Sequence, residues 1–94
     1  MPTARARATL PAGVALHARP AGRLVRAAAG FESTIEVVAG GKRASARSIL
    51  ALLALGAAGG TELVLSAEGA DAEAALAALV GLVESLAEGS SEAS

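Results

Sequence analysis

The residues best suited to chemistry lie in the run from Ala15 to Ala21, which reads Ala-Leu-His-Ala-Arg-Pro-Ala. It contains the only histidine of the chain, His17, with Arg19 two residues later and Pro20 directly after. Neutral imidazole is a nucleophile, and its charge changes near physiological pH. The planar guanidinium of an arginine binds phosphate oxygens through paired hydrogen bonds. This spacing therefore predicts a site that can hold a phosphoryl group.

An apolar stripe after this run indicates that the run begins a helix. From Ala18 onward the apolar residues recur at helical spacing, at Ala21, Leu24, Val25 and Ala28, and Gly30 follows where the helix should end. The unpaired N–H groups of a helix start favour an anion, and a first turn tolerates proline. The alternative is a histidine that only caps or lines a helix.

Composition sets the size and general class of the protein. The 94 residues suffice for one small domain, which we place at residues 1–88, with a flexible tail of small polar residues at 89–94. Apolar residues make up 53%, but many are alanine, so leucine, valine and isoleucine must build the core. The net charge of −1 gives no nucleic-acid footprint, although the basic residues all lie in the first half.

Several classes of function are excluded by what the chain lacks. It has no cysteine and one histidine, so we expect no thiol chemistry, no metal site and no cofactor. The longest apolar run, residues 49–58, is about half of what a membrane span needs. The start of the chain has no hydrophobic leader, so we expect a cytoplasmic protein with no membrane insertion.

The hydrophobic pattern predicts the order β-α-β-β-α-β-α. Alternating residues predict strands at 5–10, 34–39, 42–46 and 61–67, with a Gly40-Gly41 turn between the second and third. Helical spacing predicts a first helix from Ala18, a short one at 49–55 and a last one after Asp71, which should cap it. The expected fold is an α+β open-faced β-sandwich, with a four-stranded antiparallel sheet and three helices on one face.

The short helix at 49–55 is apolar at nearly every position, which is unusual for its length. Ser48 is suited to cap its start, and Gly56 follows its end. Such a helix is either buried on all sides or presents an apolar patch to a partner.

The chain resembles the HPr family, the histidine-containing phosphocarriers of the phosphoenolpyruvate-dependent sugar phosphotransferase system, over residues 5–88. One motif is residues 16–21, Leu-His-Ala-Arg-Pro-Ala, which is similar to the family's phosphorylation site. Another is residues 41–50, Gly-Lys-Arg-Ala-Ser-Ala-Arg-Ser-Ile-Leu, with Leu55-Gly56 closing the helix. Residues 67–69 followed by Asp71 also fit. The family usually has glycine where this chain has Ala15, and an alanine disfavours a positive φ there.

The resemblance implies a role for each matching residue. His17 would carry the phosphoryl group on Nδ1, and Arg19 would contact that group. Ser48 matches a serine that a dedicated kinase phosphorylates in many Gram-positive relatives. The residues expected to contact partner proteins are Ala18, Ala21, Leu24, Arg47, Ile49, Leu50, Leu53 and Leu55.

The implied function is phosphoryl carriage, not enzymatic turnover of a free substrate. His17 would receive the group from enzyme I and pass it to the IIA components of sugar transporters, and an HPr serine kinase/phosphorylase would act on Ser48. We expect a monomer, because a lasting oligomer would cover the docking patch. Two alternatives remain open: an HPr-like regulatory or nitrogen-branch protein that acts by binding, and a plain α+β interaction module with an incidental histidine.

Overall fold

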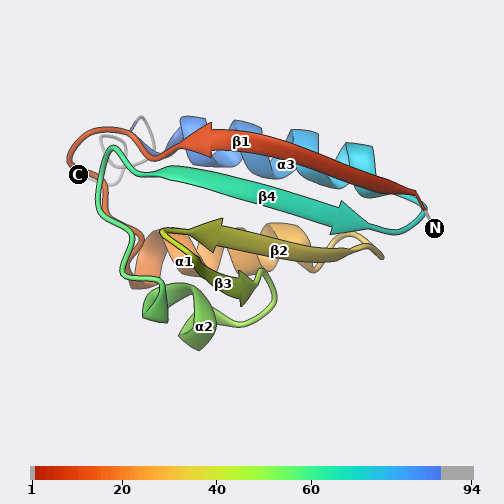
Figure 1. Cartoon of the computed structure of the whole chain (residues 1–94), viewed down its shortest axis with the longest axis horizontal. Helices are drawn as coiled ribbons and strands as arrows, with labels where there is room; N and C mark the ends of the chain where they lie inside the picture. The colour runs from red at the N-terminus through yellow and green to blue at the C-terminus, as the bar shows by residue number, and fades with distance from the viewer. Residues whose placement is uncertain (1, 88–94) are drawn as a thin grey trace.

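Four strands form one antiparallel sheet in the computed structural model of the chain, which describes residues 2–87 (Figure 1). Across the sheet the order is β1-β4-β2-β3, and three helices lie behind it, which confirms the predicted open-faced sandwich. The elements in chain order are β1 (Thr3–Thr9), α1 (Ala18–Ala28), β2 (Thr34–Ala39), β3 (Lys42–Ser45), α2 (Ile49–Ala54), β4 (Glu62–Glu68) and α3 (Ala72–Glu84).

The core lies between the sheet and the helices, where the alternating pattern of each strand directs its apolar residues. In β4 the side chains of Leu63, Leu65 and Ala67 are buried, whereas Glu62 and Glu68 are exposed. The largest fully buried side chains are almost all leucine, valine or isoleucine, as the composition predicted. Burial of such a side chain contributes about 1.5–3 kcal/mol, so these residues hold the helices on the sheet.

Strand boundaries differ from the prediction by one or two residues, and sheet pairing explains the shift. β1 begins at Thr3 instead of Arg5, and β4 ends at Glu68 instead of Ala67. These two ends are partners, since Thr3 faces Glu68 in the antiparallel register. A pairing partner extends a strand beyond the residues whose alternation reveals it, and no local pattern shows that.

Two predicted glycine positions have different outcomes. Gly40 and Gly41 have φ values of 56° and 82° and join β2 to β3, so the predicted hairpin turn is confirmed. α1 ends one residue before its C-cap, Ala29, and Gly30 does not adopt a positive φ. The amide of Gly30 instead donates to the Ala27 carbonyl at 3.1 Å, so the helix ends in a tight right-handed turn.

Asp71 precedes α3 as predicted, but its side chain makes no capping bond to that helix. The carboxylate accepts hydrogen bonds from the Glu32 amide at 2.8 Å, the Ser33 amide at 3.0 Å and the Ser33 hydroxyl. The Ser33 hydroxyl bond is the main reason that the pKa of Asp71 lies below its ordinary value. The predicted cap is therefore wrong, because the segment after α1 comes close enough to supply better donors.

Gly69 makes that close approach between two segments sterically feasible. A Cβ atom at this position would lie 2.6 Å from the Ser33 Oγ and 2.8 Å from the Ser33 Cα. The loop before α3 and the segment after α1 are thus locked together.

The predicted tail at 89–94 lies outside the described residues. Within residues 2–87 no helix has the length and apolarity to cross a membrane.

Candidate functional site

His17 occupies the N-cap position of α1, with extended backbone angles of φ −100° and ψ −166°. Its carbonyl accepts a hydrogen bond from the Ala21 amide at 2.9 Å, which begins the helix. The side chain makes no capping hydrogen bond and is exposed. The backbone of His17 is therefore fixed by the helix, whereas neither ring nitrogen forms a hydrogen bond that caps the helix.

The first turn of α1 adds donors beside the imidazole. The first amides of a helix have no partner inside it, and Ala21 is the first whose N–H returns to the backbone. Pro20 has no N–H and is buried, so the amides of Ala18 and Arg19 remain for an anion. Arg19 itself is exposed in this turn. The structure thus brings the predicted histidine and arginine together at one helix start.

The segment before His17 is fixed by a second loop that we did not single out from the sequence. The Leu16 amide donates to the Ala57 carbonyl at 2.9 Å, and the Leu16 side chain is buried. A Cβ atom at Gly59 would lie 2.5 Å from the Gly13 nitrogen and 2.8 Å from the Val14 nitrogen. Only a glycine permits this contact. The Gly59-Gly60 pair is visible in the sequence, but its contact across the chain is not.

Ala15, which stands where the family usually has glycine, needs no unusual conformation here. Among the described residues, only glycines have a positive φ, and in this loop that residue is Gly13 at 80°. The Ala15 carbonyl accepts from the His17 amide at 2.9 Å. The alanine is therefore compatible with the approach of the loop to His17.

Ser48 is the N-cap of α2, as predicted. Its hydroxyl oxygen accepts from the Ala51 amide at 3.1 Å, and its carbonyl accepts from the Leu52 amide at 3.0 Å. The side chain is half-buried, so the hydroxyl still reaches the surface. The capping role is confirmed, whereas a regulatory role stays a prediction.

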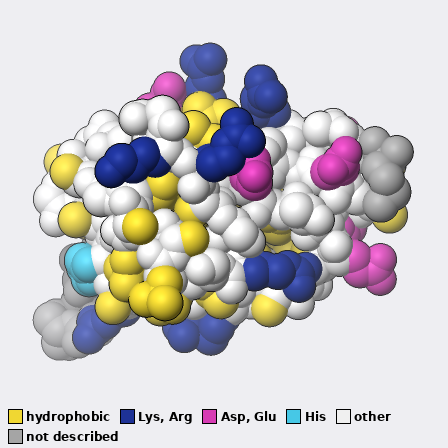
Figure 2. All heavy atoms as spheres, turned by 60° about the horizontal axis from the view of Figure 1, so that its bottom comes forward, with side chains coloured by type: hydrophobic (Ala, Val, Ile, Leu, Met, Phe, Trp, Pro, Cys, Tyr) yellow, Lys and Arg dark blue, Asp and Glu magenta, His cyan; other side chains and the backbone are white. Residues whose placement is uncertain are grey.

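α2 presents an apolar patch at the surface, so this helix is not buried on all sides. Ile49 is 39% exposed, Leu50 is 76% exposed and Leu53 is half-buried, whereas Leu52 is fully buried. We refer to Ile49, Leu50 and Leu53 as the α2 patch. Figure 2 shows hydrophobic side chains gathered over this part of the surface, with the histidine beside them.

The α2 patch adjoins α1 through a helical glycine. A Cβ atom at Gly22 would lie 3.7 Å from the Ile49 Cδ1 and 3.6 Å from the Arg26 Nη1. Ile49 therefore packs on the second turn of the helix that begins at His17. The α2 patch and the imidazole therefore lie on one continuous surface.

Three of the residues predicted to contact partners lie instead in the core. Ala21 and Leu24 are 0% exposed and Leu55 is 7% exposed, so no partner can reach them in this structure. Ala21 and Leu24 belong to the apolar stripe of α1, and this stripe faces the sheet. Ala18 is exposed and remains accessible.

Arg47 is exposed, but its guanidinium already has partners within the chain. It donates to the Phe31 carbonyl and, at 3.5 Å, to the Ser33 carbonyl. It therefore fastens the start of α2 to the segment after α1. Contact with a partner protein stays a prediction for this residue.

Positive charge surrounds this surface. Arg19, Arg23 and Arg26 lie four and three residues apart along α1, a spacing that places them on one side of the helix. In the part of the chain that the structure describes, the one ion pair joins Arg43 to Glu36 at 3.8 Å. The arginines of α1 therefore form no ion pair with a described residue and can contact a partner or a phosphoryl group.

Comparison with known proteins agrees with this geometry. The family pattern described as "PTS HPr component phosphorylation site" matches residues 4–85. The chain is 45% identical over 71 residues to the phosphocarrier protein HPr of Haemophilus influenzae, an alignment that covers 76% of this chain and 84% of that protein. A plain interaction module with an incidental histidine would not match in this way.

Similar relationships hold for a second sequence and for solved structures. The phosphocarrier protein HPr of Vibrio cholerae is 44% identical over 71 residues, covering 76% of this chain and 84% of that protein. The crystal structure of HPr from Bacillus anthracis superposes with a TM-score of 0.82 at 32% identity, covering 88% of this chain and 99% of that one. The chain therefore belongs to the HPr family, the phosphocarrier proteins of the phosphotransferase system.

Proposed function

We propose that His17 accepts a phosphoryl group from enzyme I, which draws it from phosphoenolpyruvate, and passes it to IIA components of sugar transporters. One observation carries this proposal above the others. The imidazole is exposed at the start of α1, directly beside the α2 patch and the arginines of that helix. A partner that docks on the patch brings its own acceptor or donor group to the imidazole.

The transfer requires position and charge stabilisation more than covalent machinery. In acceptance, a lone pair of a His17 ring nitrogen, Nδ1 by family likeness, forms a bond to phosphorus as the bond from the donor group breaks. The open amides of the first turn and the Arg19 guanidinium stabilise the charge on the three equatorial oxygens. Donation to a IIA component is the same displacement in reverse, with the partner supplying the attacking nitrogen or oxygen.

Ser48 serves in this proposal as an inhibitory phosphorylation site for an HPr serine kinase/phosphorylase. A phosphoserine adds nearly two negative charges, which a helix N-terminus accommodates. The helix should therefore persist. The new charge would lie beside the α2 patch, where docking would have to remove its water and bring it against an acidic partner surface.

The location and oligomeric state follow from the same surface. The α2 patch must meet soluble partners one after another, so we infer a cytoplasmic monomer. An oligomer that covered Ile49 and Leu50 would block the entry of every donor and acceptor.

A reconstituted transfer assay tests the proposal. The chain is mixed with phosphoenolpyruvate and enzyme I, separated from them, and then added to a sugar-specific IIA domain or a nitrogen-branch IIA domain. We expect one phosphoryl group per chain, complete loss in His17→Ala, and transfer to the sugar-specific domain. Transfer only to the nitrogen-branch domain would support the regulatory alternative. Phosphorylation of His17→Ala at the wild-type level would overturn the proposal.

A further inference from the structure

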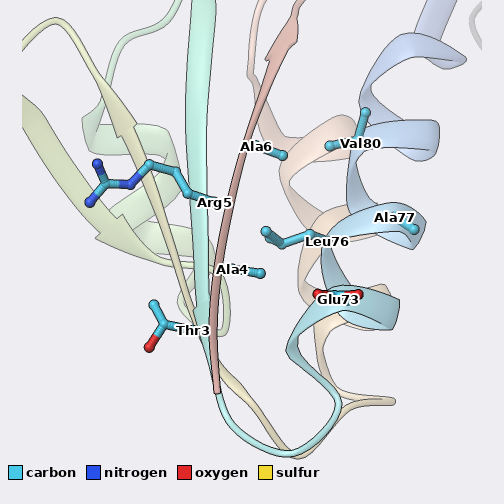
Figure 3. Close-up of a pocket in the computed structure, with 8 residues that line it drawn as sticks. All are labelled: Thr3, Ala4, Arg5, Ala6, Glu73, Leu76, Ala77 and Val80. Carbon is cyan, nitrogen blue, oxygen red and sulfur yellow. The ribbon is translucent and has the colours of Figure 1, made fainter. Parts of the chain in front are cut away.

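A hollow of about 510 Å³ opens between β1 and α3, at the edge of the sheet opposite β3 (Figure 3). Ala4 and Ala6 of β1 point into it from one side, and Leu76 and Val80 of α3 from the other. The hollow exists because two alanines occupy inward positions of the strand, where larger side chains would fill the space. Ala77 completes the apolar part of the lining, and Thr3, Arg5 and Glu73 are its polar members.

The hollow adjoins the outer edge of β1, with which no second strand of residues 2–87 pairs. β1 lies at the margin of the sheet and pairs only with β4. At the two ends of β1, the Pro2 carbonyl and the Leu10 amide each form a 2.9 Å hydrogen bond toward the β4 side. Bonded residues alternate along an antiparallel strand. The backbone N–H and C=O groups of Arg5 and Arg7 therefore point outward from the sheet, ready to pair with another strand.

The side chains of Arg5 and Arg7 give this edge a positive charge on the open face of the sheet. Their cross-strand neighbours are Ser66 and Val64, neither of which is acidic. Neither arginine forms an ion pair with a residue that the structure describes. An added strand would therefore meet two cations on one face and, on the other, a hollow in which the apolar side chains of Leu76 and Val80 lie beside Glu73.

A second copy of this chain fits the edge poorly. Opposite residues of an antiparallel pair lie on the same face, so only registers that keep Arg5 and Arg7 on one face are available. A register centred on Ala6 sets Arg5 against Arg7 of the other copy, and a register centred on either arginine sets that arginine against the same residue of the other copy. Registers centred on Ala4 or Ala8 avoid this repulsion, but they pair only one end of β1. Like charges directly opposite each other are destabilising. The charge pattern favours acidic residues at alternate positions of the incoming strand.

We propose that the free edge of β1 binds an extended segment of a partner protein in which acidic residues alternate with apolar ones. The backbone of that segment pairs with Arg5 and Arg7, as in other strand additions. Its acidic side chains lie beside the two guanidinium groups. Its apolar side chains enter the hollow against Leu76, Ala77 and Val80. The site lies at the opposite sheet edge from β3, so the chain can be tethered there while His17 remains accessible.

A peptide titration followed by backbone NMR tests the proposal on the full chain. The probe is a capped peptide of alternating glutamate and valine with the length of β1, seven residues. The matched control peptide has lysine in place of glutamate. We expect amide shifts centred on Arg5, Arg7 and Val80, and affinity for the glutamate peptide about tenfold higher than for the lysine peptide. Equal affinities, or shifts centred on Leu50, would overturn the proposal.

Two variants separate the charge and hollow contributions, and a third serves as the control. Ala6→Leu fills the hollow and should weaken binding of the glutamate peptide about tenfold. The double change Arg5→Glu and Arg7→Glu should reverse the preference toward the lysine peptide. Arg43→Glu, on β3 at the other sheet edge, is the control and should bind as wild type does.

Folding of each variant is checked by its phosphorylation on His17, which the proposal leaves unchanged. An Ala6→Leu protein that is phosphorylated normally and binds the peptide as tightly as wild type would contradict the role of the hollow. If Arg43→Glu lost as much affinity for the glutamate peptide as the β1 variants, the effect would come from the net charge of the protein and not from a site on β1. Dimers that form through β1 and exclude the peptide would show that the occupant is a second copy.

Discussion

The exposure of His17 follows from its position directly before the first helical turn. A residue at the N-cap has extended backbone angles, so its side chain leaves the stripe that packs on the sheet. The next inward positions, Pro20 and Ala21, are buried and fix the helix start. One residue thus combines a rigid backbone with an open side chain, as transfer between two docked partners requires.

Replacement of Arg19 should slow phosphoryl transfer without unfolding the domain. The guanidinium is exposed, so its loss removes a charge-assisted contact to the phosphoryl group and little packing. Such a contact is worth about 1.5–3 kcal/mol, or about ten- to a hundredfold in rate. Arg19→Lys should recover only part of the lost transfer rate, because lysine lacks the paired donors of arginine. Rapid-quench transfer rates measure the effect, and a wild-type rate for Arg19→Ala would leave Arg19 no role.

Two changes at Ser48 should separate its capping role from its regulatory role. Ser48→Asp keeps an acceptor for the Ala51 amide, so thermal stability should stay within about 1 kcal/mol of wild type. The charge beside the α2 patch should nevertheless slow phosphorylation by enzyme I. Ser48→Ala should lose about 1 kcal/mol and transfer normally.

Calorimetry and transfer kinetics on the same Ser48 preparations give both quantities. If Ser48→Asp transferred the phosphoryl group at the wild-type rate, capping would be the only supported role of Ser48. An unfolded Ser48→Asp protein would contradict the docking explanation, since the helix itself would then be the target of the charge.

At the scale of elements, the position of His17 depends on contact between two loops that lie far apart in the sequence. The loop that ends at His17 lies against the loop that precedes β4, through the Leu16–Ala57 hydrogen bond and the contact at Gly59. α1 is thus anchored from its N-terminal side by a loop that belongs to the other half of the chain.

Gly59→Ala should disturb the histidine from a distance. The added Cβ atom meets backbone nitrogen atoms of Gly13 and Val14, and neither can move like a flexible side chain. We expect lower thermal stability, altered amide shifts from Gly13 to His17, and slower phosphorylation. Gly81→Ala is the control, because no atom lies near a Cβ at that position of α3. Unchanged His17 shifts in Gly59→Ala would show that the two loops are uncoupled.

The order and type of the elements could be predicted because each has a local signal. Alternation in β4, the glycine pair after β2 and the serine before α2 all act within a few residues. The misassigned residues on α1 show the limit. Helical spacing marks Ala21 and Leu24 as one face, but it does not say whether that face meets the sheet or a partner. The same limit applies to Gly59, whose contact joins distant segments.

At the scale of the whole molecule, Asp71 links the two long helices. Its carboxylate joins the segment after α1 to the start of α3, and Arg47 fastens the same segment to the start of α2. A capping rule could not predict this role, because it considers only the residues that follow the aspartate. The three helices are therefore held in register by side chains from the loops between elements.

The hydrogen bonds of Asp71 to Glu32 and Ser33, which we call the Asp71 clamp, should make the folding stability depend on pH. Hydrogen bonds from Ser33 and Glu32 hold the pKa of Asp71 below its ordinary value of 3.8. A carboxyl with a lowered pKa in the folded state stabilises the fold fully above its ordinary pKa, and that contribution is lost as pH falls through the lowered value. Asp71→Asn should therefore melt at a lower temperature than wild type near neutral pH.

The difference between the two proteins should shrink as the pH falls well below 3.8. Thermal unfolding by circular dichroism at a series of pH values measures it. A difference that is constant across the series would mean that the charge of Asp71 contributes nothing to the clamp.

The fold leaves two regions open: the surface where α1 and α2 meet, and the edge of β1. The first surface surrounds the imidazole of His17, on which the proposed phosphoryl transfer depends. The most direct measurement is tandem mass spectrometry of the chain after treatment with phosphoenolpyruvate and enzyme I, under alkaline conditions that preserve a phosphoramidate. We expect one phosphoryl group, located on His17 and lost on mild acid treatment. A phosphoryl group found on any other residue, or an acid-stable one, would contradict it.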